Sequence, residues 1–191
     1  MTSNLFTRRI LAVLFAAAVP CLTLSTLAHA QSAPEPHVSI GVGAGVTNLL
    51  HGDFDFSPVV VDVSVRARLS SAALIEGAVT QWRHTDVFEA SNFRQETRWT
   101  GRSYQVNVLG HHRAGRATMF AGGGVGVVTL DRRSSSSTYA ASAFSVQGIG
   151  GVDVDLGARV AALGQARFTG NTRDFGSSDV AVTAGLRIKV W

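Results

Sequence analysis

Residues 179–191 alternate between two rows of opposite chemistry, and this pattern constrains the fold more than any other feature of the sequence. Successive side chains of a strand point to opposite faces, so each row would cover one face. A face that is apolar along its whole length must contact something apolar, and lipid is the expected partner. The apolar row is Val180, Val182, Ala184, Leu186, Ile188 and Val190, and the opposite row is Asp179, Ala181, Thr183, Gly185, Arg187 and Lys189.

The same alternation of period two recurs in seven earlier segments, which are separated by turn-like breaks. Connections at 70–71, 114–117 and 157–159 are short, whereas those at 84–98, 131–142 and 171–178 are longer and polar, and 50–58 is a further outer connection. Outer-membrane barrels place short turns in the periplasm and long loops outside. We therefore expect an all-β fold, an eight-stranded antiparallel transmembrane up-and-down β-barrel, with strands at 38–47, 59–69, 72–84, 102–112, 118–130, 144–156, 160–169 and 179–191.

The N-terminus has the features of an export signal. Arg8 and Arg9 precede an apolar run at 10–19, and Ala28-His29-Ala30 is a small-x-small cleavage site. Polar residues interrupt the apolar run before it reaches the ~20 residues of a spanning helix, which disfavours an uncleaved anchor. We expect a signal peptide over 1–30, which contains the only cysteine, Cys21, and a barrel domain over 31–191.

The charge of the chain does not indicate a nucleic-acid-binding protein. Removing Arg8 and Arg9 from the 17 basic residues leaves 15 against 13 acidic ones, so the mature chain is close to neutral. No basic run or basic stripe with interleaved aromatic residues is present in the sequence. The sequence therefore predicts no nucleic-acid partner.

A soluble barrel such as a lipocalin would show the same alternation. Lipid contact is favoured because the non-apolar rows hold Gly, Ser and Thr with scattered charges, which suits a narrow interior better than a soluble surface. Aromatic residues lie mostly near strand ends, where interfacial girdles are expected. These residues are Trp82, Trp99, Tyr104, Phe120, Phe144, Phe168 and Trp191.

Three segments, residues 120–126, 151–155 and 185–191, carry a family resemblance. They are similar to the outer membrane protein β-barrel domain family, the small barrels related to outer membrane proteins A, X and W. The resemblance implies the bacterial cell outer membrane as location, with the barrel-assembly machinery and periplasmic chaperones as partners during biogenesis. It also implies a C-terminal insertion signal, in which Val190 stands at the usual aromatic position and Trp191 follows it. The residues of this signal are Gly185, Leu186, Ile188, Val190 and Trp191.

Charged residues recur on the rows expected to face the lumen. Because a narrow interior has a low dielectric constant, charges placed there must pair. One interpretation is a salt-bridged plug, and the alternative is a narrow polar or anion-conducting passage. The predicted lumen charge network consists of Arg66, Arg68, Glu76, Arg102, Asp153, Asp155, Arg167 and Arg187.

Some eight-stranded barrels act on lipid A, and the start of the first strand carries a His, a Ser and an acid that could form a catalytic set. His37 and Ser39 share one face of the first strand, with Glu35 nearby, and their spacing resembles the His-x-Ser motif of lipid A deacylase. In that family, however, the motif lies on a late strand near the outer leaflet, not at the periplasmic end of the first strand. We expect no catalytic residues.

Two segments contain histidines that could bind a metal ion. His111 and His112 are adjacent in a strand and point to opposite faces, so they cannot bind one ion from the same side. His84 and Asp86 lie on one side but lack further ligands. We expect no metal site and no cofactor.

The sequence therefore predicts a non-catalytic outer-membrane barrel with a structural or surface-interaction role, surrounded by outer-membrane lipid and lipopolysaccharide. The alternative is a narrow channel or carrier for small solutes, and a lipid A-modifying enzyme is third. Surface contacts are expected from Phe88, Phe93, Arg94, Arg98, Arg132, Arg133 and Tyr139.

Overall fold

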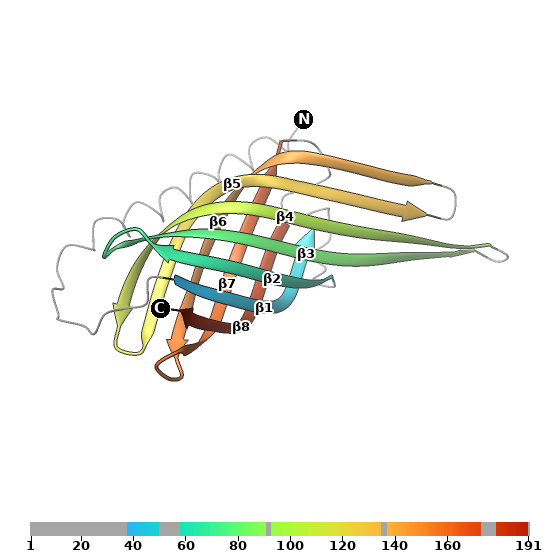
Figure 1. The fold of residues 1–191 in the computed structure, drawn as a ribbon. Coiled ribbons are helices and arrows are strands. Elements are labelled where there is room, and N and C mark those ends of the chain that lie inside the picture. Colours follow the sequence, from blue (N-terminus) through green and yellow to red (C-terminus); the bar gives the residue numbers. More distant parts are fainter. Residues whose placement is uncertain (1–37, 50–57, 91–92, 135–136, 173–178, 191) are drawn as a thin grey trace, which may run out of the picture.

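Eight strands form a closed barrel in a computed structural model that describes residues 38–49, 58–90, 93–134, 137–172 and 179–190 (Figure 1). Each strand pairs antiparallel with the next, and the first pairs with the last, so the predicted fold class is confirmed. The expected signal peptide at 1–30 lies outside the described residues, among which no helix is long and apolar enough to span a membrane. The strands are β1 (Val38–Leu49), β2 (Val59–Arg68), β3 (Ala73–Ala90), β4 (Phe93–Ala114), β5 (Ala117–Ser134), β6 (Thr138–Asp155), β7 (Val160–Asn171) and β8 (Asp179–Val190).

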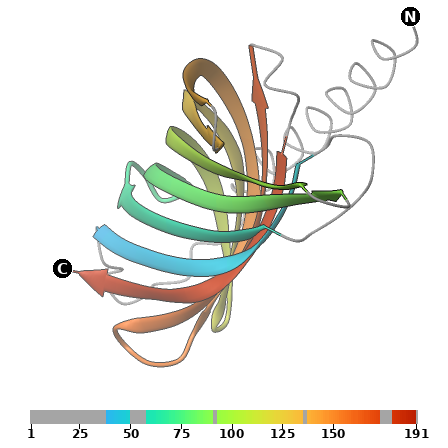
Figure 2. The ribbon, with the colours of Figure 1, turned by 90° about the vertical axis from the view of Figure 1, so that its right-hand side faces the viewer.

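The strand register determines how wide the barrel is. Following directly opposed residues once around it from Val38 leads back to β1 at Asn48, ten residues further along the strand. For eight strands, this stagger gives a tilt of about 40° and a radius of about 8 Å to the backbone. The inclination is visible in Figure 2. Side chains can fill an interior of this size.

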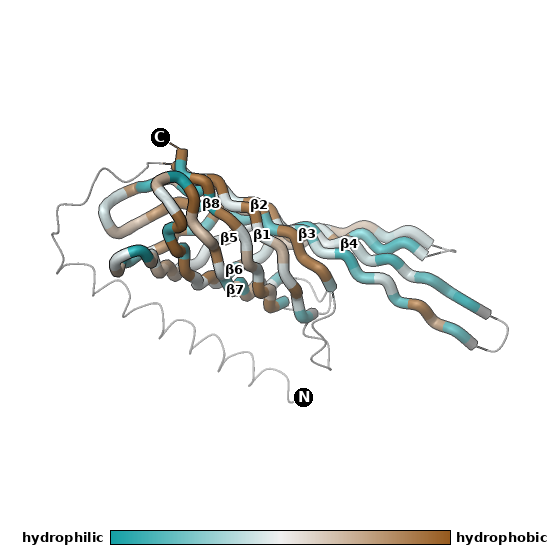
Figure 3. Tube along the Cα trace, turned by 90° about the horizontal axis from the view of Figure 1, so that it is seen from below, coloured by the Kyte–Doolittle hydropathy of each residue, from teal (hydrophilic) through white to brown (hydrophobic). Residues whose placement is uncertain are grey.

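The two faces of the strands have the predicted opposite chemistry. The β2 row of Val59, Val61, Val63 and Val65 points outward and is exposed, whereas the alternate residues are buried in the lumen. Figure 3 shows apolar segments along the barrel strands and hydrophilic segments toward the far ends of the longest strands. An apolar outer surface around a polar interior reverses the arrangement of a soluble protein.

Four strands continue well beyond the barrel wall. The last pair between β2 and β3 is Val59 with Arg83, yet β3 and β4 remain paired to Ala90 and Phe93. The long connections expected at 84–98 and 131–142 are therefore mostly strand, because cross-strand hydrogen bonds continue regardless of side-chain polarity. We call residues 84–90, 93–99, 131–134 and 138–143 the protruding sheet.

The expectation of an aromatic girdle is wrong for three of the ring-bearing residues. Trp82 and Phe120 face the lumen and are only 8% and 4% exposed, and Trp99 lies on the same side, packed against a buried apolar cluster. Trp82 covers Gly101, where a Cβ would overlap the indole ring. Position near a strand end does not determine which face a ring occupies; the phase of the alternation does.

Apolar side chains form two buried layers in the lumen. The layer nearer the protruding sheet contains Trp82, and the layer nearer the short turns contains Phe120. Polar side chains also lie at the level of the second layer, where Asp153 is directly opposite Leu163. The first layer consists of Val60, Trp82, Leu130 and Ala181, and the second of Leu109, Phe120, Ile149 and Leu163, with Leu74 packed against it.

Candidate functional site

Arg66 organises one half of the polar lumen. Its Nε lies 2.6 Å from Glu76 Oε2, and its Nη1 lies 3.1 Å from Asp153 Oδ2. The same Asp153 oxygen is 3.1 Å from Nε of Arg187. The guanidinium carbon of Arg66 also lies 3.7 Å from the centre of the Phe120 ring, a cation–π contact. Arg66 is thus held between two carboxylates and an aromatic face.

Arg167 organises the other half. Its Nη2 lies 3.2 Å from Asp62 Oδ2 and 3.2 Å from Glu76 Oε1. Gln165 Nε2 donates to Asp62 Oδ1 at 2.8 Å, and Asn107 Nδ2 donates to Glu76 Oε1 at 3.0 Å. The carboxylates therefore receive amide donors in addition to the guanidinium groups.

These contacts form one alternating chain of three cations and three anions, which we call the central network. Every member is at most 8% exposed. Buried charges are tolerated only when paired, and equal numbers of the two signs leave no excess charge in the lumen. In order of contact, the members are Arg187, Asp153, Arg66, Glu76, Arg167 and Asp62.

A glycine of β1 leaves room for the network. A Cβ at Gly41 would lie 2.9 Å from Ser64 Oγ and 3.0 Å from Arg187 Nη2. The long guanidinium side chain of Arg187 occupies the space that a side chain on β1 would take. The small residues of the lumen row thus have a packing role.

The structure brings together five of the eight residues predicted for the lumen network: Arg66, Glu76, Asp153, Arg167 and Arg187. Asp62 was not included in the prediction, although it lies on the same β2 row as Ser64 and Arg66. That row position was the signal that could have identified it.

Arg68 and Asp155 lie apart from the central network, at the short-turn end of the lumen. Asp155 Oδ1 is 2.6 Å from Lys189 Nζ, and its Oδ2 is 2.9 Å from Arg113 Nη2. These ion pairs form a separate cluster at the rim, on the row that the alternation predicts.

The inward placement predicted for Arg102 is wrong. It lies on the outward row of β4, in phase with Tyr104 and Val106, and its Nη1 is 3.5 Å from Asp131 Oδ2. Its position beyond the apolar part of that row explains the charge, because the outward face is polar there. Arg83 lies on the corresponding outward row of β3 and is also exposed.

The lumen side of the protruding sheet carries a second constellation. His84, Trp99, Arg132 and Tyr139 are directly opposed across β3, β4, β5 and β6, and we call them the aromatic row. Trp99 Nε1 donates to Asp86 Oδ2 at 2.9 Å. The sequence predicts Arg132 and Tyr139 in outer loops and Trp99 near a strand end, and it does not predict their alignment, which depends on the strand register.

The candidate catalytic and metal residues do not assemble into a centre in the described part of the chain. Ser39 lies at the first end of β1, opposite Arg66 and Lys189, whereas His37 and Glu35 are outside the described residues. No group of three or more His, Cys, Asp or Glu side chains within the described ranges is arranged to hold a metal ion.

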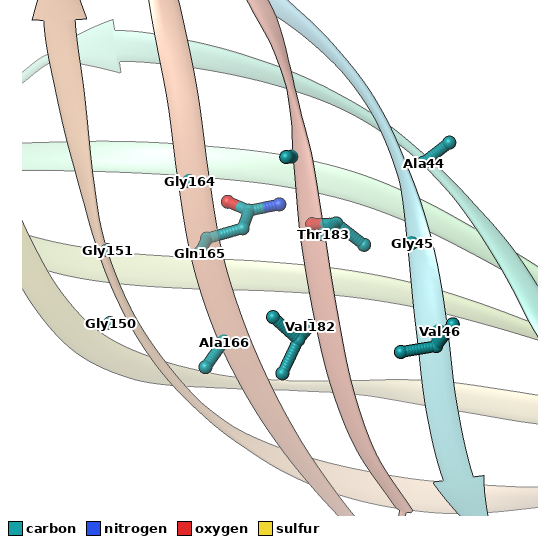
Figure 4. A pocket seen from close by; sticks show the side chains of 11 residues that line it. Ala44, Gly45, Val46, Gly150, Gly151, Gly164, Gln165, Ala166, Val182 and Thr183 are labelled. Atoms are coloured by element: carbon teal, nitrogen blue, oxygen red, sulfur yellow. The ribbon is translucent and has the colours of Figure 1, made fainter. Parts of the chain in front are cut away.

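A shallow depression of about 500 Å³ lies where β1, β6, β7 and β8 meet (Figure 4). Its lining comes mostly from outward rows and consists mainly of Gly, Ala and Val. Gln165 and Thr183 are its only polar side chains, so it offers no acid–base pair for catalysis.

A closed eight-stranded barrel with an apolar outer surface and a filled polar lumen defines the class of small outer-membrane barrels. The chain matches the outer membrane protein beta-barrel domain family over residues 14–190 and belongs to this family. It is a bacterial outer-membrane protein, as the resemblance implied. A comparison with curated proteins gave no significant match.

Solved structures of outer-membrane proteins share the fold. Ail of Yersinia pestis, solved with the heparin analogue sucrose octasulfate, aligns with a TM-score of 0.57 at 14% identity over 81% of this chain and 100% of its own. Neisserial surface protein A gives 0.62 at 10% identity, covering 81% and 97%. OprG of Pseudomonas aeruginosa gives 0.52 at 9% identity, covering 84% and 98%. None of these three is described as an enzyme.

Proposed function

We propose that this protein is a non-catalytic surface-interaction protein, in which the barrel is a closed anchor and the protruding sheet makes the contacts. The observation that carries the proposal is the contrast between paired, buried charges in the lumen and exposed charged and aromatic side chains on the sheet. Phe88 and Tyr139 are 63% and 52% exposed, and the side chains of Arg94 and Arg98 are 69% and 72% exposed. Large exposed aromatic residues are typical of binding surfaces.

The structural neighbours support a surface role by analogy. Ail has been crystallised in complex with the heparin analogue sucrose octasulfate, so a protein of this fold can form a complex with a sugar derivative. At 14% identity the likeness concerns the fold, so the ligand of Ail is not transferred to this chain.

The filled lumen argues against the channel alternative. The central network crosses the lumen from β2 and β3 to β6, β7 and β8, and the Phe120 ring lies against Arg66 within it. Purified protein in planar bilayers is expected to give no well-defined conductance steps. Steady steps whose ion selectivity changes in Arg167→Ala, at unchanged stability, would instead establish a pore.

The outward face of the barrel suits outer-leaflet lipid. Arg83 and Arg102 lie just beyond the apolar rows, and Arg102 is paired with Asp131. At this level, guanidinium groups would meet phosphate groups of lipopolysaccharide. On β8, Leu186 and Ile188 point outward and are 53% and 54% exposed, a position from which the assembly machinery could recognise them during insertion. Trp191, the last residue of that proposed signal, is outside the described residues.

Cysteine labelling tests the orientation. The only cysteine, Cys21, falls in the expected signal peptide, so an introduced thiol is unique in the mature chain. Phe88→Cys in intact cells should react with a membrane-impermeant maleimide, whereas Arg116→Cys should react only after the outer membrane is opened. The reverse pattern would place the protruding sheet in the periplasm and end the surface proposal.

Trimming the sheet tests the function itself. Residues 85–98 and residues 132–139 would each be replaced by Asn-Gly, a two-residue hairpin turn, with assembly checked by resistance to protease. Cells with the wild-type protein are expected to bind an array of glycans and matrix proteins more strongly than cells without it. The trimmed protein should lose this gain. Full retention of binding by the trimmed barrel would refute the assignment of contacts to the sheet.

A further inference from the structure

We propose that the aromatic row binds a saccharide that carries one acidic group. This inference deepens the proposed surface function and rests on it, since it names the ligand class for the lumen side of the protruding sheet. The four members lie on adjacent strands in register, so they project from one face and span about 14 Å. That span is long enough for a disaccharide.

The row is held in position by contacts of its own. Both carboxylate oxygens of Asp86 are engaged, one with Trp99 Nε1 at 2.9 Å and the other with His84 Nε2 at 2.6 Å. Trp99 also packs against the buried layer that contains Trp82 and Leu130. Its indole ring therefore has a fixed orientation before any ligand arrives, which lowers the entropic cost of binding.

Arg132 is the residue that binds the acidic group of the ligand in this proposal. Its guanidinium carbon lies 5.0 Å from the centre of the Trp99 ring, and the residue is exposed. Among the described residues, no carboxylate lies within salt-bridge distance of Arg132, unlike Arg94 and Arg98 on the opposite face of the sheet. A planar guanidinium group oriented by a ring and lacking an anionic partner is suited to a carboxylate ligand.

The neighbours of Arg132 suit the rest of a sugar. Tyr139, directly opposite, is 52% exposed and offers a flat apolar surface for the C–H face of a pyranose. Asp86 and His84 present planar hydrogen-bonding groups for hydroxyls. Asp86 also carries a negative charge, so the row favours a ligand with a single acid over a polyanion.

The position of the row indicates where the ligand comes from. The aromatic row continues the lumen side of β3–β6, whereas Arg83 and Arg102 lie on the side that faces neighbouring lipid. We therefore assign the row to a glycan presented from outside the cell rather than to lipopolysaccharide of the same leaflet.

The test uses the mature full-length protein in phospholipid nanodiscs free of lipopolysaccharide, with sialyllactose as the probe and lactose as its neutral counterpart. Calorimetry should show binding of sialyllactose at least tenfold tighter than that of lactose. Arg132→Gln should weaken sialyllactose binding at least tenfold, and Tyr139→Ala should weaken both sugars. Arg116→Gln removes the charge of an exposed arginine in the short turn between β4 and β5, at the other end of the barrel, and it should change the affinity less than twofold.

Each contrary outcome overturns the inference. Equal affinities for the two sugars would show that the site has no preference for an acidic group. Equal effects of Arg132→Gln and Arg116→Gln, with unchanged circular dichroism, would show that the aromatic row is not the binding site. Displacement of sialyllactose by purified lipopolysaccharide would assign the row to lipid instead. No binding by the wild-type protein also refutes the saccharide site, while the whole-cell assay separately decides the surface function.

Discussion

Two Arg–Glu pairs in this molecule have the same distance between nitrogen and oxygen but differ in how far they are exposed to water. In the lumen, Arg66 Nε lies 2.6 Å from Glu76, with side chains 3% and 0% exposed; on the protruding sheet, Arg98 Nε lies 2.6 Å from Glu96, with side chains 72% and 40% exposed. Water and salt screen the exposed pair, whereas the buried pair belongs to a network shielded from water, in which Arg66 also contacts Asp153 and Glu76 also contacts Arg167. The distance between charges therefore says little about stability unless their surroundings are known.

The largest effect is expected from Arg66→Ala. The substitution leaves Asp153 with one guanidinium partner and Glu76 with one, and it removes the contact with Phe120, at a cost of about 3–5 kcal/mol. Denaturant unfolding of the barrel in lipid vesicles would measure this loss as a lower midpoint. A midpoint within experimental error of wild type would show that the lumen is hydrated and that the central network is not a plug.

A second comparison uses two outward valines of similar exposure, Val106 on the barrel and Val87 on the protruding sheet, at 55% and 48%. Val106→Arg places a charge in the apolar band and should cost about 2–4 kcal/mol. Val87→Arg should be nearly neutral, because that residue faces water. The same unfolding measurement applies, and equal costs at the two positions would mean that the membrane boundary is not where we place it.

Two glycines on opposite faces give a smaller contrast. Gly41→Ala brings a methyl group against Arg187 and Ser64, and it should cost about 1 kcal/mol because flexible side-chain ends can shift. Gly77 faces outward with open space around it, so Gly77→Ala should be neutral or slightly stabilising through the unfolded chain. Unfolding midpoints measured side by side decide the order, and a larger loss at Gly77 would contradict the packing role of the β1 glycine.

The smallest effect is expected from Arg98→Ala, the exposed counterpart of Arg66→Ala. Loss of a solvent-exposed pair should cost about 0.2–1 kcal/mol and should shrink further at high salt. Unfolding at low and high ionic strength would test both statements. A loss comparable to that of Arg66→Ala would show that the protruding sheet is as tightly constrained as the lumen.

The barrel was predictable because its signal is local. A period of two with one uniformly apolar row appears within each strand, and Val59–Arg68 shows the predicted order of exposed and buried residues almost without exception. The wrong predictions concern residues whose face was not taken from the alternation along the strand. Arg102 and Trp82 were assigned by their chemistry and by their distance from a strand end, whereas the alternation itself places the first outward and the second inward.

The partners within the lumen were not predictable because they depend on the stagger of the whole barrel. Arg66 and Asp153 are 87 residues apart and come from β2 and β6, across the lumen from each other. No local sequence pattern indicates that these two side chains are in contact. The aromatic row was not predictable for the same reason, because its members align only when four strands are in register. Polarity alone suggested loops at 84–98 and 131–142.

The distribution of the central network over the chain has a consequence for assembly. The early strands β2 and β3 bring two acids and one arginine, whereas β6, β7 and β8 bring two arginines and one acid. The network residues of the early strands thus carry a net negative charge and those of the late strands a net positive charge. The network becomes neutral only when β8 is in place beside β1. Because uncompensated charge keeps water bound, the interior can dry only in the complete barrel. The network therefore distinguishes a complete barrel from an incomplete one. A chain that stops short of β8 lacks Arg187, so its lumen stays hydrated and the barrel is less stable.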